Sequence, residues 1–191
     1  MRRAAIVEQE RSLIARQQAF RRAADVVTDC WMGFRDIVAV SLIGSVSRPL
    51  WREVPRFSAF RHARIAVWHE CKDVDLAVWI EDLSRLDKMR QAAVDALRNA
   101  VGLGVADHQV DAFLIEPGTD RYLGRLCHFA TCPKGKRECA VPGCGATPFL
   151  RQHEAFVPGD NLLAPARFAM LYRRGEGRLR SALDLPGTPE D

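Results

Sequence analysis

Two segments with alternating apolar and polar residues, separated by a helical segment, constrain the fold more than any other feature of this sequence. In residues 73–80, Val74, Leu76 and Val78 fall on one face, and residues 108–115 alternate in the same way. A period of two is typical of a strand that buries one face. Between them, residues 84–101 carry apolar side chains at helical spacing. This order predicts an α/β (α+β) fold, with helices packed on one face of a small mixed sheet.

A further strand and a long helix are predicted before this unit. Residues 37–43 form a short β-branched run that stops at Gly44-Ser45, which suits a buried strand. Residues 3–34 repeat large apolar side chains every seven positions, which predicts one amphipathic helix. The helix expected over residues 84–101 begins with Ser84-Arg85-Leu86-Asp87, which resembles a capping box.

The size and composition of the chain indicate one domain, or one domain with a small appendage. The chain has 191 residues, of which 48% are hydrophobic and 27% charged, values typical of a globular protein. Its longest nearly apolar stretch is residues 37–46, about half the length that a membrane-spanning helix needs. We therefore expect a cytoplasmic protein with no membrane partner.

Three regions are expected along the chain: an N-terminal helix over 1–36, a core over 37–120 and a C-terminal region over 121–191. The core contains an insertion over 46–70, in which arginines alternate with aromatic residues between two prolines. The C-terminal region should contain a Cys-rich loop, followed by a helix over 162–174.

Acidic residues lie on two of the predicted strands. Asp73 and Asp75 are two positions apart, so both carboxylates should project from one face, and Asp111 on the later strand adds a third. Carboxylate oxygens are the ligands that Mg²⁺ or Mn²⁺ prefers. A turn led by Gly44 and Ser45 at a helix N-terminus would offer backbone N–H groups to phosphate oxygens. Together these residues indicate a site for metal-assisted phosphoryl chemistry.

The order of these residues resembles the DNA polymerase β-like nucleotidyltransferase superfamily over residues 37–115. Membership would imply Mg²⁺-dependent transfer of a nucleoside monophosphate from an NTP substrate to a hydroxyl acceptor. By this resemblance, Gly44 and Ser45 would hold the triphosphate, and Asp73 and Asp75 would bind both metals. Asp111 would complete the metal site and help to activate the acceptor hydroxyl.

The sequence departs from the family in the spacing of its motifs. The family has about a dozen residues between Gly-Ser and the first Asp, whereas 27 residues, 46–72, lie between Ser45 and Asp73 here. The insertion over 46–70 is therefore expected to be a lid or an acceptor-binding segment within this family, and a solvated loop with a small satellite core is the alternative. A small metabolite, a protein side chain and an RNA end remain open as acceptors. The alternative function is a non-catalytic, zinc-containing module that binds a nucleotide or a partner.

Four of the six cysteines lie within 18 residues, in a segment rich in Gly and Pro. Tight turns let thiolates converge on one tetrahedral ion, and a reducing cytoplasm favours Zn²⁺ over disulfides. His128 or His153 could replace Cys127 as the fourth ligand. Cysteines without a metal and a redox disulfide are the remaining interpretations. The expected zinc ligands are Cys127, Cys132, Cys139 and Cys144.

Overall fold

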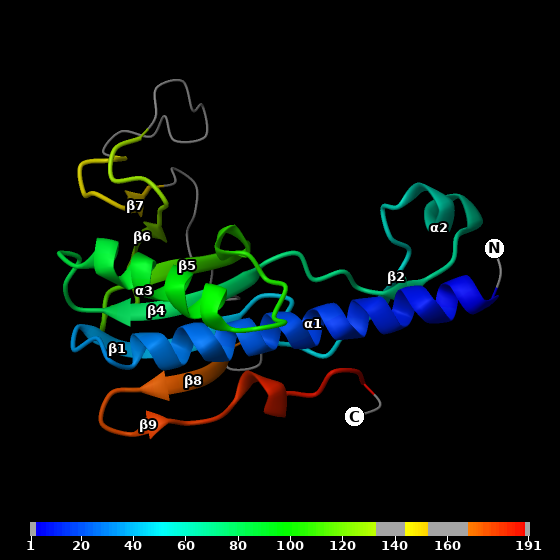
Figure 1. Cartoon of the computed structure of the whole chain (residues 1–191), viewed down its shortest axis with the longest axis horizontal. Helices are drawn as coiled ribbons and strands as arrows, with labels where there is room; N and C mark the ends of the chain where they lie inside the picture. The colour runs from blue at the N-terminus through cyan, green and yellow to red at the C-terminus, as the bar shows by residue number, and fades with distance from the viewer. Residues whose placement is uncertain (1–2, 133–143, 153–167, 190–191) are drawn as a thin grey trace.

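The computed structural model describes residues 3–132, 144–152 and 168–189. Helices and strands alternate along much of this chain (Figure 1). The elements are α1 (Arg3–Trp31), β1 (Ile37–Ile43), β2 (Arg52–Glu53), α2 (Ser58–Ala63), β3 (Val67–Trp68), β4 (Val74–Ile80), α3 (Leu86–Asn99), the 3-10 turn η1 (Asp107–Gln109), β5 (Val110–Ile115), β6 (Tyr122–Leu126), β7 (Leu150–Arg151), β8 (Ala169–Arg173), β9 (Gly177–Arg178) and the 3-10 turn η3 (Ala182–Asp184).

Seven of the described strands form one mixed sheet, in the order β7-β6-β5-β4-β1-β8-β9. Strands β4 and β5 are parallel and are joined through α3, while the other neighbouring pairs are antiparallel. A parallel pair needs a crossover connection, and α3 supplies it. The fold is therefore α+β, with β1 and β4 near the middle of the sheet.

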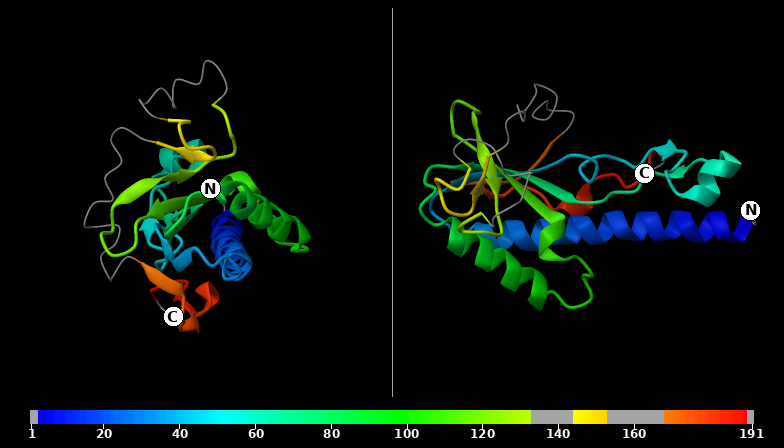
Figure 2. Two further views of the ribbon diagram at one scale, coloured as in Figure 1. Left: turned by 90° about the vertical axis from the view of Figure 1, so that its left-hand side faces the viewer. Right: turned by 90° about the horizontal axis from the view of Figure 1, so that it is seen from above.

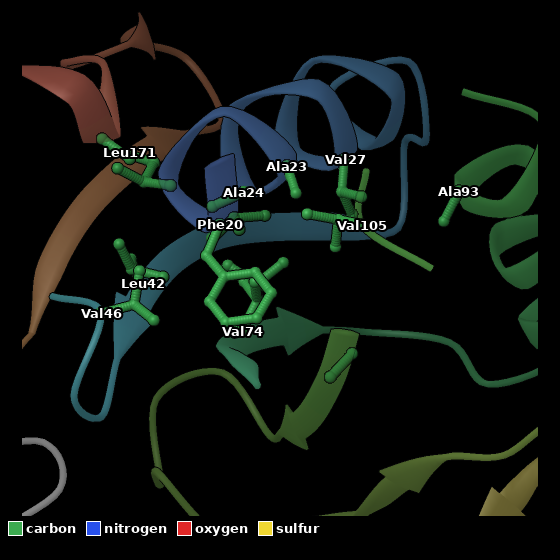
Figure 3. Packing of buried hydrophobic residues seen from close by; sticks show 14 of the residues in the cluster. Phe20, Ala23, Ala24, Val27, Leu42, Val46, Val74, Ala93, Val105 and Leu171 are labelled. Carbon is green, nitrogen blue, oxygen red and sulfur yellow. The ribbon is translucent and has the colours of Figure 1, made fainter. Parts of the chain in front are cut away.

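Helices α1 and α3 cover one face of the sheet (Figure 2). The alternation in β4 sends Val74, Leu76 and Val78 to this face, where all three are fully buried. They pack in one cluster with residues of α1 that include Phe20 and Val27 (Figure 3). Burial of large apolar side chains on one helix stripe and one sheet face accounts for this packing.

The opposite face of the sheet carries a much smaller apolar cluster. Its buried members are Ile43, Ala77 and Ile115, one from each of the three central strands. On this face the alternation also places the carboxylates of Asp75 and Asp111. The face opposite α1 and α3 therefore holds the polar residues that the sequence singled out.

The insertion over 46–70 packs against the N-terminal half of α1 (Figure 1). It contains the two-stranded sheet β2-β3 and the short helix α2. Arg16 Nη1 on α1 donates to Glu70 Oε1 at 2.9 Å, and Arg52 forms an ion pair with Glu10. The segment is thus built into the fold as an ordered extension of the core.

A buried arginine joins α1 to the C-terminal segment. Arg21 is 2% exposed, and its guanidinium donates to the backbone carbonyls of Val46, Arg48, Leu185 and Pro186. A guanidinium has five N–H donors, so one side chain can satisfy several carbonyls. This contact holds the turn after β1 and residues 185–186 against the same side of α1.

The structure confirms the main elements that the sequence predicts. The expected strands over 37–43, 73–80 and 108–115 correspond to β1, β4 and β5, and the sheet is mixed. The long N-terminal helix ends at Trp31, three residues before the predicted end. In the described part of the chain, no helix is both long enough and apolar enough to cross a bilayer.

Two predictions for segments away from the carboxylates are wrong. The capping box is absent, because Ser84 Oγ donates to Asp82 Oδ2 at 2.6 Å and Arg85 caps α3 without a side-chain hydrogen bond. The helix expected over 162–174 is also wrong, since Ala169–Arg173 is strand β8, while residues 162–167 lie outside the described residues. Pairing with the open edge of β1 overrides the helical preference of Ala, Met and Leu there.

Candidate functional site

The three predicted carboxylates gather where β4 and β5 begin. Asp75 is the register partner of Asp111 in the parallel pair β4-β5, and Asp73 directly precedes β4. Residues at matching register positions in adjacent strands project to the same face. The sequence prediction that these three residues share a site therefore agrees with their placement in the sheet.

The carboxylates interact electrostatically. Burial, followed by the charges of Asp111 and Asp73, raises the pKa of Asp75 to about 7, against the opposing effect of Arg125. Burial also raises the pKa of Asp111, although the guanidinium of Arg125 opposes this shift. Like charges disfavour one another's ionised forms when water is excluded. A positive charge among them would relieve this repulsion.

Gly44 makes room for the carboxylate of Asp75. Its φ is +73°, and a β-carbon at this position would overlap Oδ2 of Asp75 and lie 3.3 Å from its Cγ. Both the left-handed backbone and the close approach require glycine. Residues 44–47 form a turn in which Ser47 Oγ donates to the carbonyl of Gly44 at 2.9 Å. The expected helix N-terminus at this turn is wrong, because the next described helix begins at residue 58.

Arg125 is the cationic partner of Asp111 in this structure. Its Nη1 lies 2.6 Å from Oδ2 of Asp111, and both side chains are about one quarter exposed. In the described part of the chain, no group of three or more His, Cys, Asp or Glu side chains is arranged to hold a metal ion. A cation that used Asp111 as a ligand would have to take the place of this guanidinium.

Two cavities meet at Asp73. The first has a volume of about 400 Å³ and is lined by Ser45, Asp73 and Asp75, and also by Arg56, His69 and Lys72. The second has a volume of about 300 Å³, and its walls include Asp73, Asp111, Arg125, His128 and Arg151. Asp75 lines only the first cavity and Asp111 only the second. The carboxylates therefore lie at a boundary between two spaces of substrate size.

The first cavity contains a histidine that sequence reasoning left without a role. Nδ1 of His69 lies 3.0 Å from Oε1 of Glu53, and its ring stacks on Trp51 with centroids 3.8 Å apart. Trp51 Nε1 donates to the other carboxylate oxygen of Glu53 at 3.2 Å. A histidine fixed by a carboxylate and a stacked ring is well oriented toward a ligand. Its partner is 16 residues away, so no local motif revealed the pair.

The predicted zinc ligands are only partly within the described residues. Cys127 lines the second cavity, and Cys132 and Cys144 are half-buried. Cys139 and the alternative ligand His153 lie outside the described residues. Nδ1 of the other alternative, His128, lies 3.6 Å from Oδ2 of Asp107. The zinc site therefore stays a prediction from the sequence.

Comparison with protein-family models, curated proteins and solved structures found no match to this chain.

Proposed function

We propose that the chain is a Mg²⁺-dependent nucleotidyltransferase that moves a nucleoside monophosphate from an NTP to a hydroxyl acceptor. The observation that carries the proposal is the convergence of Asp73, Asp75 and Asp111 beside Gly44, a position with no room for a β-carbon. Either feature alone has an ordinary structural explanation. Their occurrence at one point, bordered by two cavities, supports a site for two substrates.

The residues present fit divalent cations by their donor chemistry. Three carboxylates offer hard oxygen ligands. Burial is the main cause of the raised pKa of Asp75, and the charges of Asp111 and Asp73, which a cation would neutralise, add to it. Asp73 and Asp75 would hold the cations, and Asp111 would join them after Arg125 moves away. Bound Mg²⁺ supplies stabilisation of the negative charge on the transferring phosphoryl group.

The arrangement of the cavities supports a division between the two substrates. Ser45 lies in the first cavity, together with the basic side chains of Arg56 and Lys72. We assign this space to the nucleotide, because phosphate oxygens are bound by backbone N–H groups and by cationic side chains. The second cavity, which Asp111 lines, then receives the acceptor. Asp73 contacts both spaces and would position the two substrates against each other.

We assign the insertion a role different from that of an acceptor-side lid. Arg56 and His69 line the cavity that we assign to the nucleotide. Arg52, in contrast, forms an ion pair with Glu10, and its guanidinium carbon lies 4.2 Å from the centroid of the Trp68 ring. We propose that the insertion forms one wall of the nucleotide site, instead of a lid on the acceptor side.

The ion pair between Arg125 and Asp111 favours a second candidate function. A stable guanidinium partner satisfies Asp111 without a metal ion. In that case the chain would be a non-catalytic, zinc-containing module that holds a nucleotide or a partner. The two candidates differ in whether pyrophosphate is released.

The test combines binding and turnover in three variants. Asp73→Asn and Asp75→Asn should abolish the Mg²⁺-dependent part of nucleotide binding and also pyrophosphate release, because Asn is a much weaker Mg²⁺ ligand. Asp111→Asn should retain nucleotide binding and lose turnover. Binding is measured with a non-hydrolysable NTP analogue, and transfer with labelled NTPs. If all three variants bind Mg²⁺-nucleotide like the parent, the catalytic proposal is wrong.

A further inference from the structure

Two arginines lie side by side in the wall of the second cavity. Arg125 on β6 and Arg151 on β7 are register partners in an antiparallel pair, so both side chains project to the same face. Gly124 permits the close approach of these strands, because a β-carbon there would lie 2.9 Å from the carbonyl oxygen of Arg151. Like charges at directly opposed positions destabilise a sheet. The pair is therefore costly unless an anion lies beside it.

Asp111 is the anion that the structure places next to this pair. It accepts a hydrogen bond from Arg125, and the charges of both arginines act to lower its pKa. Asp111 thus contacts one guanidinium group of the pair and lies within the electrostatic influence of the other. Asp73 also lines this cavity, but it lies at the border with the nucleotide space as well.

Metal binding would change this balance. If Asp73 and Asp111 bind divalent cations, their negative charge is no longer available to Arg125 and Arg151. Among the described residues that line the second cavity, no other carboxylate then lies beside the two guanidinium groups. Guanidinium groups bind carboxylate and phosphate groups through paired hydrogen bonds.

We propose that Arg125 and Arg151 bind an anionic group of the acceptor, which is a small hydroxyl compound carrying a phosphate or a carboxylate. This inference rests on the proposed function and adds the chemical class of the second substrate. The volume of about 300 Å³ fits a small molecule. Ser45 lies in the first cavity, which we assign to the nucleotide. The anion site in the second cavity is therefore distinct from the proposed triphosphate site.

The experiment measures binding of matched probes by calorimetry. Glycerol 3-phosphate, glycerate and glycerol are titrated into the full chain with Mg²⁺ and a non-hydrolysable NTP analogue. The two anionic probes should bind and glycerol should not. The phosphate and carboxylate arms show which anionic group the pair prefers. Absence of binding by both anionic probes overturns the inference.

Variants of Arg151 test whether the anionic probes bind at the arginine pair. Arg151→Gln should weaken binding of the anionic probe at least tenfold, while Arg61→Gln, at an exposed position on α2 outside both cavities, should leave it unchanged. Arg151→Lys keeps the charge and gives a folded comparison if the Gln variant is unstable. The Lys variant should weaken binding severalfold, because an ammonium cannot form the paired hydrogen bonds. Unchanged binding in Arg151→Lys and Arg151→Gln overturns the inference.

Measurements of nucleotide binding distinguish a failure of this inference from a failure of the proposed function. If Arg151→Gln weakens nucleotide binding as much as probe binding, the arginine pair belongs to the nucleotide site and the inference is wrong. If the anionic probe binds but Mg²⁺-nucleotide does not, the anion site stands and the proposed function fails.

Discussion

Asp75 and Asp111 are direct neighbours in the parallel register of β4 and β5, on the face of the sheet opposite helices α1 and α3. A protein that used these positions only for stability would gain little from two adjacent carboxylates. The folded chain holds Asp75 with a pKa of about 7, well above the usual value for Asp. The pair is therefore an energetic cost of the metal-free fold.

The first prediction is that the metal-free protein loses stability as the pH rises. Below about pH 4, Asp75 is protonated in both the folded and the unfolded chain. Between pH 4 and 7 the unfolded chain releases this proton first, so unfolding becomes more favourable, and above 7 the whole cost is present. The cost is on the order of a few kcal/mol, at about 1.4 kcal/mol per unit of pKa shift.

Urea unfolding with EDTA at several pH values checks this prediction. Asp75→Asn should reduce the loss of unfolding free energy between pH 4 and 7 and should be more stable than the parent at pH 7.5. Asp95→Asn on the exposed side of α3 should keep the parent's slope. Equal slopes in parent and Asp75→Asn would show that Asp75 does not titrate in this range.

The second prediction concerns the contact between Gly44 and Asp75. Gly44→Ala imposes a left-handed backbone on alanine, which costs about 1–2 kcal/mol, and drives its β-carbon into the carboxylate, which costs about 1–3 kcal/mol more. Moving the carboxylate should also weaken Mg²⁺-nucleotide binding. Gly102→Ala is the matched control, because Gly102 has the same φ of +73° with nothing within 4 Å.

Chemical unfolding measures the loss of stability in both variants, and calorimetric titration measures their nucleotide binding. The control should lose about 1–2 kcal/mol of unfolding free energy and bind nucleotide like the parent. If Gly44→Ala and Gly102→Ala lose the same stability and bind nucleotide equally well, the close approach of Gly44 to Asp75 contributes nothing to binding.

The third prediction is that two arginines of the insertion differ in their contribution to nucleotide binding. Arg56 lines the first cavity, whereas Arg61 is exposed on α2 and does not line that cavity. Arg56→Ala should therefore weaken nucleotide binding about tenfold, the effect of losing one charge-assisted hydrogen bond. Arg61→Ala should have no effect. Titration with a fluorescent nucleotide measures both, and equal losses would contradict the assignment of Arg56 to the nucleotide wall.

The fourth prediction concerns the cysteine-rich segment. Protein purified without added zinc should contain about one Zn²⁺ per chain, and chelation should lower its melting temperature, because ligation enforces the loop. Cys132→Ser should lose the metal, whereas Cys30→Ser on α1 should retain it. Metal analysis by mass spectrometry decides the matter, and a stoichiometry near zero in intact parent protein would refute the zinc site.

The central part of the fold could be predicted because its signals are local. Strict alternation in residues 73–80 and the β-branched run 37–43 each specify a strand without reference to any partner. Strands β6 to β9 lack such signals. They are short, and β8 consists mostly of residues that favour helices, so their structure depends on edges supplied by distant strands.

The same contrast applies to the candidate site. The spacing of Asp73 and Asp75 predicts their common face, and chain order suggests Asp111. The arginine pair arises from the pairing of β6 with β7, and His69 meets Glu53 only because β2 pairs with β3. Cross-strand register creates these contacts, and a sequence without known pairing does not contain that register.

The position of β1 between β4 and β8 has a consequence for how the chain folds during its synthesis. When β1 and β4 have left the ribosome, one edge of β1 still exposes its backbone hydrogen-bonding groups, and residues 169–173 that cover it have not yet been made. The carbonyls of Leu185 and Pro186 that receive Arg21 emerge later still. A nascent chain that pauses before residue 169 therefore has Arg21 bound to the carbonyls of Val46 and Arg48 without the two later ones, and presents an open strand edge, a feature that makes partly folded chains prone to aggregate.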